Sequence, residues 1–300
     1  MTLTELFEAY ARKHLRGKSE NTLRLYRHTI RSFGKFLHRE PTIKDLDSET
    51  VQDFIWSVVK SGRKPATANK DRSQICCLWN YAAKNRLVEK YPDVPIIPEP
   101  ERVPMAWMPE ELNRILRVAK TQTHPVGEVS GKVWWTAMLL IILDTGERIG
   151  AVRNLPRSCL RDDHILVPAE IRKGKTRDRL YKVSQPTIEA IKKLTEEHSD
   201  PMLFPFPYSD TYLYRLYKKL LERAKLPTGR QNNFHMLRKS VASAVASVGG
   251  DATSALDHAS PKTTKNYLDP RIVGGIDVSA ILAAYLRGDP PPENRKRDAS

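Results

Sequence analysis

Two arginines, two histidines and one tyrosine carry the side chains that chemistry on a phosphodiester would need. A tyrosine hydroxyl has a pKa of about 10 and is a weak nucleophile until a neighbouring group removes its proton. Guanidinium groups match phosphate oxygens through paired hydrogen bonds and stabilise the charge that grows on them during attack. The five residues are therefore candidates for the polar groups that DNA strand transfer would need. They are Arg148, His235, Arg238, His258 and Tyr267.

The order and spacing of the motifs are more informative than any one of them. An H-x-x-R quartet places His235 and Arg238 on one helix face, but such quartets occur often by chance. Tyr267 follows His258 by nine residues, and a tyrosine considered alone is more often a packing residue than a nucleophile. The motifs in chain order are TGERIGAVRNL (145–155), HMLR (235–238), LDHAS (256–260) and KNYLDP (265–270).

In this combination the sequence resembles the tyrosine recombinase family, which includes phage integrases. The resemblance implies that Tyr267 forms a 3′-phosphotyrosyl bond with DNA and releases a 5′-hydroxyl, without a cofactor. Arg148 and Arg238 would hold the phosphate in place of a metal ion. His258 would donate a further hydrogen bond to the phosphate, and His235 would accept or return a proton near Tyr267.

A basic segment between the first two motifs supplies the lysine that the resemblance assigns to protonation of the departing 5′ oxygen. The segment RKGKTRDR (172–179) lies between two short apolar stretches, which predicts a β-hairpin with a basic tip. Alignment from the entering strand favours Lys173, which we prefer, and alignment from the exit favours Lys175. Arg172 and Arg177 are expected to contact the DNA backbone.

Two positions depart from the family pattern. Members usually carry an acidic residue three positions after the first arginine, where this chain has Ala151. The glycine usual before the last histidine is replaced by Asp257. Glu147 is a candidate substitute for the missing carboxylate, although on a regular helix its side chain would point in another direction. The orientation of Arg148 therefore stays open.

The charge of the chain indicates a polyanionic partner. The net charge is +15, from 50 Lys and Arg against 35 Asp and Glu. Residues 1–90 hold 18 Lys and Arg against 10 Asp and Glu, a larger excess than their share of the chain. Nucleic acid is the commonest partner of such a surface, while a solvated basic face without a partner is the alternative.

Residues 1–90 are predicted to form four helices that present this basic surface. Thr2 and Glu5 have the spacing of a capping box at the start of the first helix. Apolar residues recur at intervals of three and four from Leu23 to Leu37, with a basic stripe on another face of the same helix. A basic turn at 62–64 precedes the fourth helix. The expected DNA contacts are Arg24, Arg27, Arg31, Lys35, Arg63 and Lys64.

Residues 91–105 contain five prolines and are predicted to run extended as a linker between two domains. The second domain, 106–287, is expected to be mostly helical with one small antiparallel sheet. Its predicted helices include 187–198, 210–224, 235–248 and 276–286. Residues 288–300 are expected to be disordered. The resemblance adds a SAM-like, core-binding N-terminal domain and a mixed α/β recombinase catalytic domain.

The three cysteines, Cys76, Cys77 and Cys159, form no C-x-x-C pair and have one histidine near them, which argues against disulfides and structural zinc. The longest apolar run, 137–143, is too short to span a bilayer. We therefore expect a cytoplasmic, DNA-associated protein without a bound metal and without a membrane partner.

The function expected from these features is site-specific recombination, integrating or excising a mobile element. The resemblance implies double-stranded DNA as partner, a homotetramer on paired sites, and an excisionase or other accessory protein. Two alternatives remain open at this point. One is DNA relaxation by an enzyme like a type IB topoisomerase, and the other is a DNA-binding accessory protein that lacks catalysis.

Overall fold

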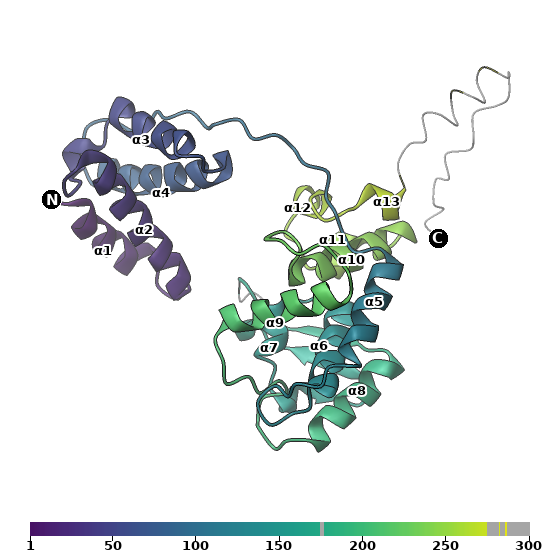
Figure 1. The fold of residues 1–300 in the computed structure, drawn as a ribbon. Helices are drawn as coiled ribbons and strands as arrows, with labels where there is room; N and C mark the ends of the chain where they lie inside the picture. Colours follow the sequence, from purple (N-terminus) through teal and green to yellow (C-terminus); the bar gives the residue numbers. More distant parts are fainter. Residues whose placement is uncertain (175–176, 275–281, 283–285, 287–300) are drawn as a thin grey trace. The chain divides into compact units, whose positions relative to one another are not determined.

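The computed structural model describes residues 1–174, 177–274, 282 and 286. Its contacts divide the chain into two compact units, Met1–Glu101 and Arg102–Ser300 (Figure 1). The predicted fold class is confirmed, because helices dominate both units and the second contains a small antiparallel sheet. No helix among the described residues is long and apolar enough to cross a membrane.

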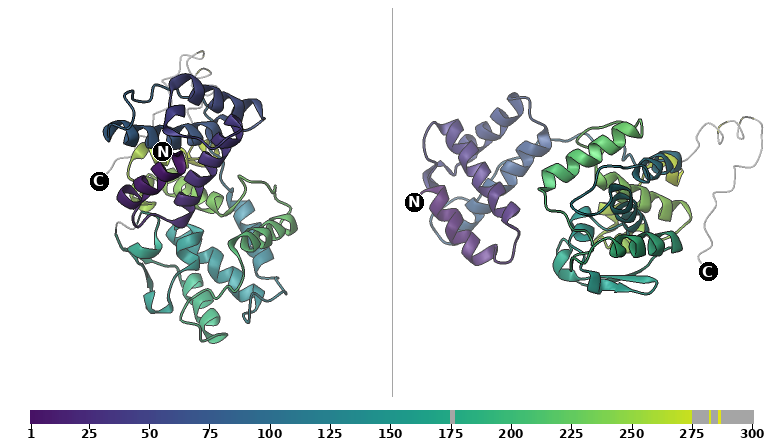
Figure 2. Two further views of the ribbon diagram at one scale, coloured as in Figure 1. Left: turned by 90° about the vertical axis from the view of Figure 1, so that its left-hand side faces the viewer. Right: turned by 60° about the horizontal axis from the view of Figure 1, so that its bottom comes forward.

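Helices α1 (Leu3–His14), α2 (Glu20–Leu37), α3 (Ser48–Lys60) and α4 (Pro65–Lys84) form the first unit, which Figure 2 shows from two further sides. The predicted capping box is present, since the backbone N–H of Glu5 donates to Thr2 Oγ1 and that of Thr2 donates to Glu5 Oε2. The core is aromatic and aliphatic, with Phe33, Phe54 and Trp79 almost fully buried. Burial of one face of each helix leaves the basic residues of α2 on the outside.

The chain after α4 packs back on the first unit before it reaches the second. Arg72 Nε donates to the carbonyl of Val94 at 2.6 Å, and Asn69 binds both the N–H and the C=O of Ile97, at 3.0 and 2.8 Å. Val94 and Ile97 are themselves buried. The first unit therefore extends to Glu101, and the proline-rich stretch from 91 to 101 covers α4 as extended chain.

The second unit is built around α6 (Gly131–Thr145), which is apolar on all sides and packs against α5 (Pro109–Ala119), α8 (Gln185–Glu196) and α10 (Phe234–Ser247). α9 (Asp210–Arg223) packs on the outside of this group, against α5. Trp134, Met138 and Leu139 on α6 have no exposed surface. A helix that is buried over most of its surface fixes the turn that follows it, and that turn carries Arg148.

Three antiparallel strands form the sheet, in the order β1 (Leu160–Arg161), β2 (His164–Val167) and β3 (Arg179–Lys182). The β2–β3 hairpin has the predicted basic tip between its strands. Strand β1 was not predicted, because it has two residues and is too short to give a sequence pattern. Val167 pairs with Arg179 at the end of the hairpin nearest its tip, and a 3-10 turn, Ala169–Ile171, follows β2. Arg172 and Lys173 come directly after this turn.

Short helices and turns carry the remaining chemistry. They are α7 (Ile149–Arg153), α11 (Ala252–Ala255), α12 (Pro261–Lys265) and α13 (Pro270–Val273), and Tyr267 lies between the last two. Gly146 ends α6 at φ 63°, and a Cβ there would lie 2.8 Å from a methyl group of Leu256. Only glycine permits this approach of the two turns. The predicted helix 276–286 and the tail 288–300 lie outside the described residues, apart from 282 and 286.

Candidate active site

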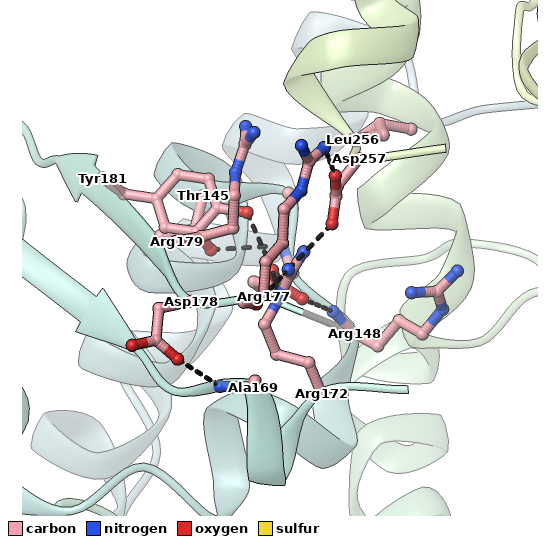
Figure 3. Close-up of polar contacts among 12 residues, drawn as sticks. Thr145, Arg148, Ala169, Arg172, Arg177, Asp178, Arg179, Tyr181, Leu256 and Asp257 are labelled. Atoms are coloured by element: carbon pink, nitrogen blue, oxygen red, sulfur yellow. Dashed lines mark hydrogen bonds and ion pairs between the residues drawn. The ribbon is translucent and has the colours of Figure 1, made fainter. Parts of the chain in front are cut away.

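Arg148 is placed by the turn after α6 and begins helix α7 as its N-cap. Its backbone N–H donates to Glu147 Oε2 at 3.3 Å. No residue in the described part of the chain forms a hydrogen bond or ion pair with its guanidinium group, which points away from the neighbouring carboxylates in Figure 3. Glu147 therefore fixes the backbone of Arg148 and leaves its five N–H donors free for a phosphate.

Arg238, unlike Arg148, is almost fully buried, with 1% of its surface exposed. Nη1 donates to the carbonyl of Gly146, and Nη2 donates to that of Leu256 at 2.5 Å. Nε is buried and has no partner among the described residues. Burial, followed by the charge of Arg148, lowers the pKa of Arg238. Arg238 thus ties together the turns that carry Arg148 and His258, and it keeps a buried donor unsatisfied within the site.

Tyr267 lies between the two histidines of the motifs. Its ring centroid is 4.8 Å from that of His235 and 4.5 Å from that of His258, both in edge-on contact. The Cζ atom of Arg238 lies 5.9 Å from the ring centroid. The carbonyl of Tyr267 accepts a hydrogen bond from Ser243 Oγ on α10 at 3.1 Å. The structure therefore gathers three of the other four predicted residues around Tyr267, which is 8% exposed.

His258 has one ring nitrogen engaged and one without a partner. Nδ1 lies 2.9 Å from the hydroxyl of Thr264, which is buried, and Nε2 is buried with no partner among the described residues. If the Thr264 hydroxyl donates to Nδ1, the proton of the neutral ring resides on Nε2. An unsatisfied buried N–H beside Tyr267 is suited to donate to a phosphate oxygen. Sequence reasoning missed Thr264, whose hydroxyl is one of many.

Both histidines have strongly lowered pKa values. Burial and then the charge of Arg238 lower the pKa of His258 to about 4, with a further contribution from Arg148. Burial and then the charge of Arg238 lower the pKa of His235 to about 4, and Arg148 contributes here too. His235 is exposed on one side, and its ring packs edge-on against that of Tyr267. Both rings are neutral at pH 7. The effect of Arg148 on both pKa values shows that its guanidinium lies close enough to act on both histidines.

These pKa values predict a pH dependence of stability. Because a histidine in the unfolded chain has a pKa of about 6.5, the unfolded state binds more protons than the folded state between pH 6.5 and 4. Stability is therefore lost as pH falls through this window and the loss levels off below about pH 4. We expect the free energy of unfolding to fall less between pH 7 and 5 in a His235→Gln, His258→Gln double variant than in the wild type. Equal losses in the two proteins, measured by urea unfolding, would contradict the assignment.

A buried carboxylate two residues after Tyr267 anchors this segment to the start of the unit. Asp269 has no exposed surface and accepts from the backbone N–H of Ala106 at 2.8 Å. Its carboxylate also pairs with the guanidinium of Arg271, which donates to the carbonyl of Ala106. Sequence reasoning did not identify this residue. The signal present was an Asp-Pro pair, which is typical of a helix start and indicates no distant partner.

Lys173 is exposed and Lys175 lies outside the described residues, so the choice between them stays a prediction. Arg172 differs from the expectation that it contacts DNA. It is 6% exposed, and its guanidinium pairs with Glu147 and Asp257. The Nε and Nη1 atoms of this buried guanidinium donate to the two carboxylates, and Arg172 therefore has a structural part in the site.

The six expected DNA contacts of the first unit all keep their side chains at least partly accessible to solvent. Arg27 is partly neutralised, because it pairs with Glu8 at 3.5 Å and with Glu20 at 3.1 Å. The described residues include no group of three or more His, Cys, Asp or Glu side chains placed to hold a metal ion. All six, Arg24, Arg27, Arg31, Lys35, Arg63 and Lys64, remain predicted DNA contacts on this unit.

Both units resemble known proteins. Residues 107–272 match the phage integrase family, and residues 2–95 match the phage integrase SAM-like domain. No curated protein matches the chain.

Solved structures share the fold at low sequence identity. A lambda integrase tetramer bound to a Holliday junction is 18% identical, with a TM-score of 0.70, and the match covers 90% of this chain and 78% of that one. A lambda integrase dimer bound to a COC′ core site is also 18% identical, with a TM-score of 0.68 and the same coverage. The Tn1549 transposon integrase in complex with a circular intermediate DNA is 15% identical, with a TM-score of 0.72 over 96% of this chain and 99% of that one.

Proposed function

Because the chain belongs to the phage integrase family, we propose that Tyr267 is the nucleophile with which this tyrosine recombinase cleaves and rejoins DNA. The observation that carries the proposal is the position of the Tyr267 ring between His235 and His258, with Arg238 5.9 Å away. The enzyme transfers DNA strands, and the matched SAM-like domain favours recombination over topoisomerase-like relaxation.

In the proposed reaction, Tyr267 Oη attacks a backbone phosphorus and gives its proton to neutral His235. A new O–P bond forms, and the bond from phosphorus to the 5′ oxygen breaks. Because the energy of the phosphodiester is kept in the 3′-phosphotyrosyl bond, the reverse attack by a 5′-hydroxyl reseals DNA without ATP. The negative phosphate entering the site would raise the pKa of His235 from about 4 and make it a better base.

Two arginines stabilise the growing phosphate charge in this proposal. The guanidinium of Arg148 is free of protein partners among the described residues, so it can bind the non-bridging oxygens directly. Arg238 contributes its charge from a buried position and retains one free donor, Nε. His258 donates through Nε2 to the same phosphate. The side chains of this chain would therefore supply the electrostatic stabilisation for strand transfer.

Covalent capture from a mixture of DNA sequences tests the reaction and identifies the target in one experiment. The wild-type protein is incubated with a randomised duplex library that carries single nicks, and adducts that resist denaturant are isolated, digested with protease and sequenced. We expect a shared motif among the captured duplexes. Bound DNA without any adduct would support a binding-only protein, and fast relaxation of plasmids that lack the motif would support a topoisomerase.

The lysine of the hairpin tip is proposed to protonate the departing 5′ oxygen. We expect Lys173→Ala to slow cleavage of the captured duplex about 100-fold, the usual scale of general acid catalysis. A duplex with sulfur in place of the bridging 5′ oxygen should restore the rate, because a thiolate leaves without a proton. Lys175→Ala is the matched control with a smaller defect. A defect of Lys175→Ala alone that sulfur restores would reverse the assignment, with single-turnover rates as the measurement.

The biological role proposed is integration or excision of a mobile element on double-stranded DNA. The matched structures include a phage integrase and a transposon integrase, both bound to DNA. A lambda integrase tetramer on a Holliday junction supports the proposal that this chain assembles as a homotetramer on paired sites. An accessory protein such as an excisionase is part of the proposal through the family resemblance alone. Sizing the protein with and without paired captured sites tests this, and a monomer under both conditions would refute it.

A further inference from the structure

We propose that Asp257 is a positioning residue that holds the basic tip of the β2–β3 hairpin, and with it Lys173, beside His258. The inference rests on the proposed function, since it concerns the lysine that acts on the leaving oxygen. It starts from a contact that the chain makes where the family usually has glycine. The two oxygens of Asp257 bind two arginines of the hairpin tip, Arg172 and Arg177, which we call the arginine pair.

Arg172 is held firmly from two sides. Its Nη1 donates to Asp257 Oδ2 at 2.8 Å, and its Nε donates to Glu147 Oε1 at 2.6 Å. The side chain of Arg172 is 5% exposed, and those of Glu147 and Asp257 are 1% and 11% exposed. Little water competes for these contacts, so the charged hydrogen bonds fix the direction of the guanidinium. Because Arg172 immediately precedes Lys173, anchoring Arg172 also restrains the backbone position of Lys173.

Arg177 closes the hairpin tip from its other end. Its guanidinium pairs with Asp257 Oδ1, and its carbonyl accepts from Arg172 Nη1 at 3.1 Å. One carboxylate therefore holds the residues that flank the segment from 173 to 176. Figure 3 shows Asp257 between the side chains of Arg172 and Arg177. Gly174 at φ 97° permits the sharp turn that this closure requires.

Glu147 connects the arginine pair to Arg148. Its Oε1 accepts from Arg172 Nε and from the hydroxyl of Tyr181 at 2.7 Å, while Oε2 accepts from the backbone N–H of Arg148. Burial and the adjacent carboxylate raise the pKa of Tyr181 to about 12, which keeps this hydroxyl a donor. The segments that carry Arg148, Lys173 and His258 thus meet at a single guanidinium, that of Arg172.

The backbone of Asp257 is a second observation that supports a role for its carboxylate. Asp257 has φ 54°, in the left-handed region where glycine is favoured. A glycine would remove the strain but would leave Arg172 with one carboxylate and Arg177 with none. The chain tolerates the less favourable backbone together with a buried charge. This combination is explained if the carboxylate orients the hairpin tip.

Asp257→Gly tests the contact without adding backbone strain, because glycine accepts φ 54° and the side chain with its carboxylate is lost. We expect the variant to cleave the captured duplex about 10-fold more slowly, a partial loss of the general acid contribution. DNA affinity should change by less than about 3-fold, since no direct phosphate contact is removed. Asp257→Asn should show the same pattern. Asp163→Asn is the matched control, because Asp163 pairs with Lys182 at 3.7 Å at the other end of the sheet.

Sulfur substitution separates a misplaced lysine from general disorder of the site. If Asp257 acts through Lys173, a duplex with sulfur at the bridging 5′ position should bring Asp257→Gly within about 3-fold of the wild type, because the leaving thiolate needs no general acid. A defect that persists on this duplex, or a wild-type rate on the oxygen duplex, overturns the proposal. A defect acting through His258 would persist, since His258 contacts the non-bridging oxygens in either substrate.

Hydrogen exchange in the protein without DNA tests the role of Asp257 independently of the proposed reaction. The backbone amide of Arg172, which donates to the carbonyl of Ala169 at 3.0 Å, should exchange hydrogen at least about 10-fold faster in Asp257→Gly than in the wild type, while the amides of α6 stay unchanged. Unchanged exchange at Arg172 would refute the contact as an anchor. If the wild type forms no DNA adduct but this exchange increases, the proposed function fails while Asp257 still holds the hairpin.

Discussion

Tyr267→Phe is expected to abolish the covalent adduct with DNA and to lower the rate of strand cleavage at least about 10⁴-fold. The substitution removes only the hydroxyl oxygen. The ring packs against Leu256 and the alanines of α10 in a small apolar cluster, which phenylalanine can fill equally well. Stability and DNA affinity should therefore stay close to those of the wild type, and the loss can be attributed to the missing nucleophile.

Tyr214→Phe serves as the control for this experiment. Tyr214 is 43% exposed on α9 of the same unit and lies outside the candidate site. We expect it to form the adduct at the wild-type rate on the captured duplex, as measured by gel separation under denaturing conditions. An adduct that persists in Tyr267→Phe would show that another residue attacks the phosphate, and the family assignment would stand without this nucleophile.

Helices of the second unit were predicted closely because their signals are local. The predicted helices 187–198, 210–224 and 235–248 correspond to α8, α9 and α10, which begin at Gln185, Asp210 and Phe234. Each has an apolar face at intervals of three and four residues. Helices α7, α11, α12 and α13 have four or five residues each. Such segments are shorter than a periodic pattern, so sequence alone could not define them.

The candidate site was predicted unevenly for a different physical reason. Spacing identified Tyr267 and His258, because both lie in one short segment whose turns are local. The role of Arg172 depends on Glu147, 25 residues away, and on Asp257, 85 residues away. A basic residue at a hairpin tip has the same appearance in the sequence whether it faces DNA or a buried carboxylate. Only the tertiary fold distinguishes the two, and it assigns Arg172 to the interior.

Arg148→Ala and Arg238→Ala are expected to share a catalytic defect and to differ in stability. Each should slow cleavage about 10³-fold, the scale for removing one preorganised donor from a developing oxyanion. Arg148→Ala should leave the free energy of unfolding within about 0.5 kcal/mol, since its guanidinium has no partner among the described residues. Arg238→Ala should lower it by about 2–4 kcal/mol, because the carbonyls of Gly146 and Leu256 lose their donor in a buried setting.

Arg153→Ala is the matched control. Arg153 lies on α7, and its guanidinium pairs with Asp210 of α9 at 3.3 Å, outside the candidate site. It should change neither the single-turnover rate nor urea unfolding by a comparable amount. The contrast between Arg148 and Arg238 follows from their surroundings, since one guanidinium is free to meet a phosphate and the other already joins two turns. Equal destabilisation by both substitutions would show that Arg148 also holds the fold together. A stable Arg238→Ala protein would show that Gly146 keeps its close approach to Leu256 without this donor.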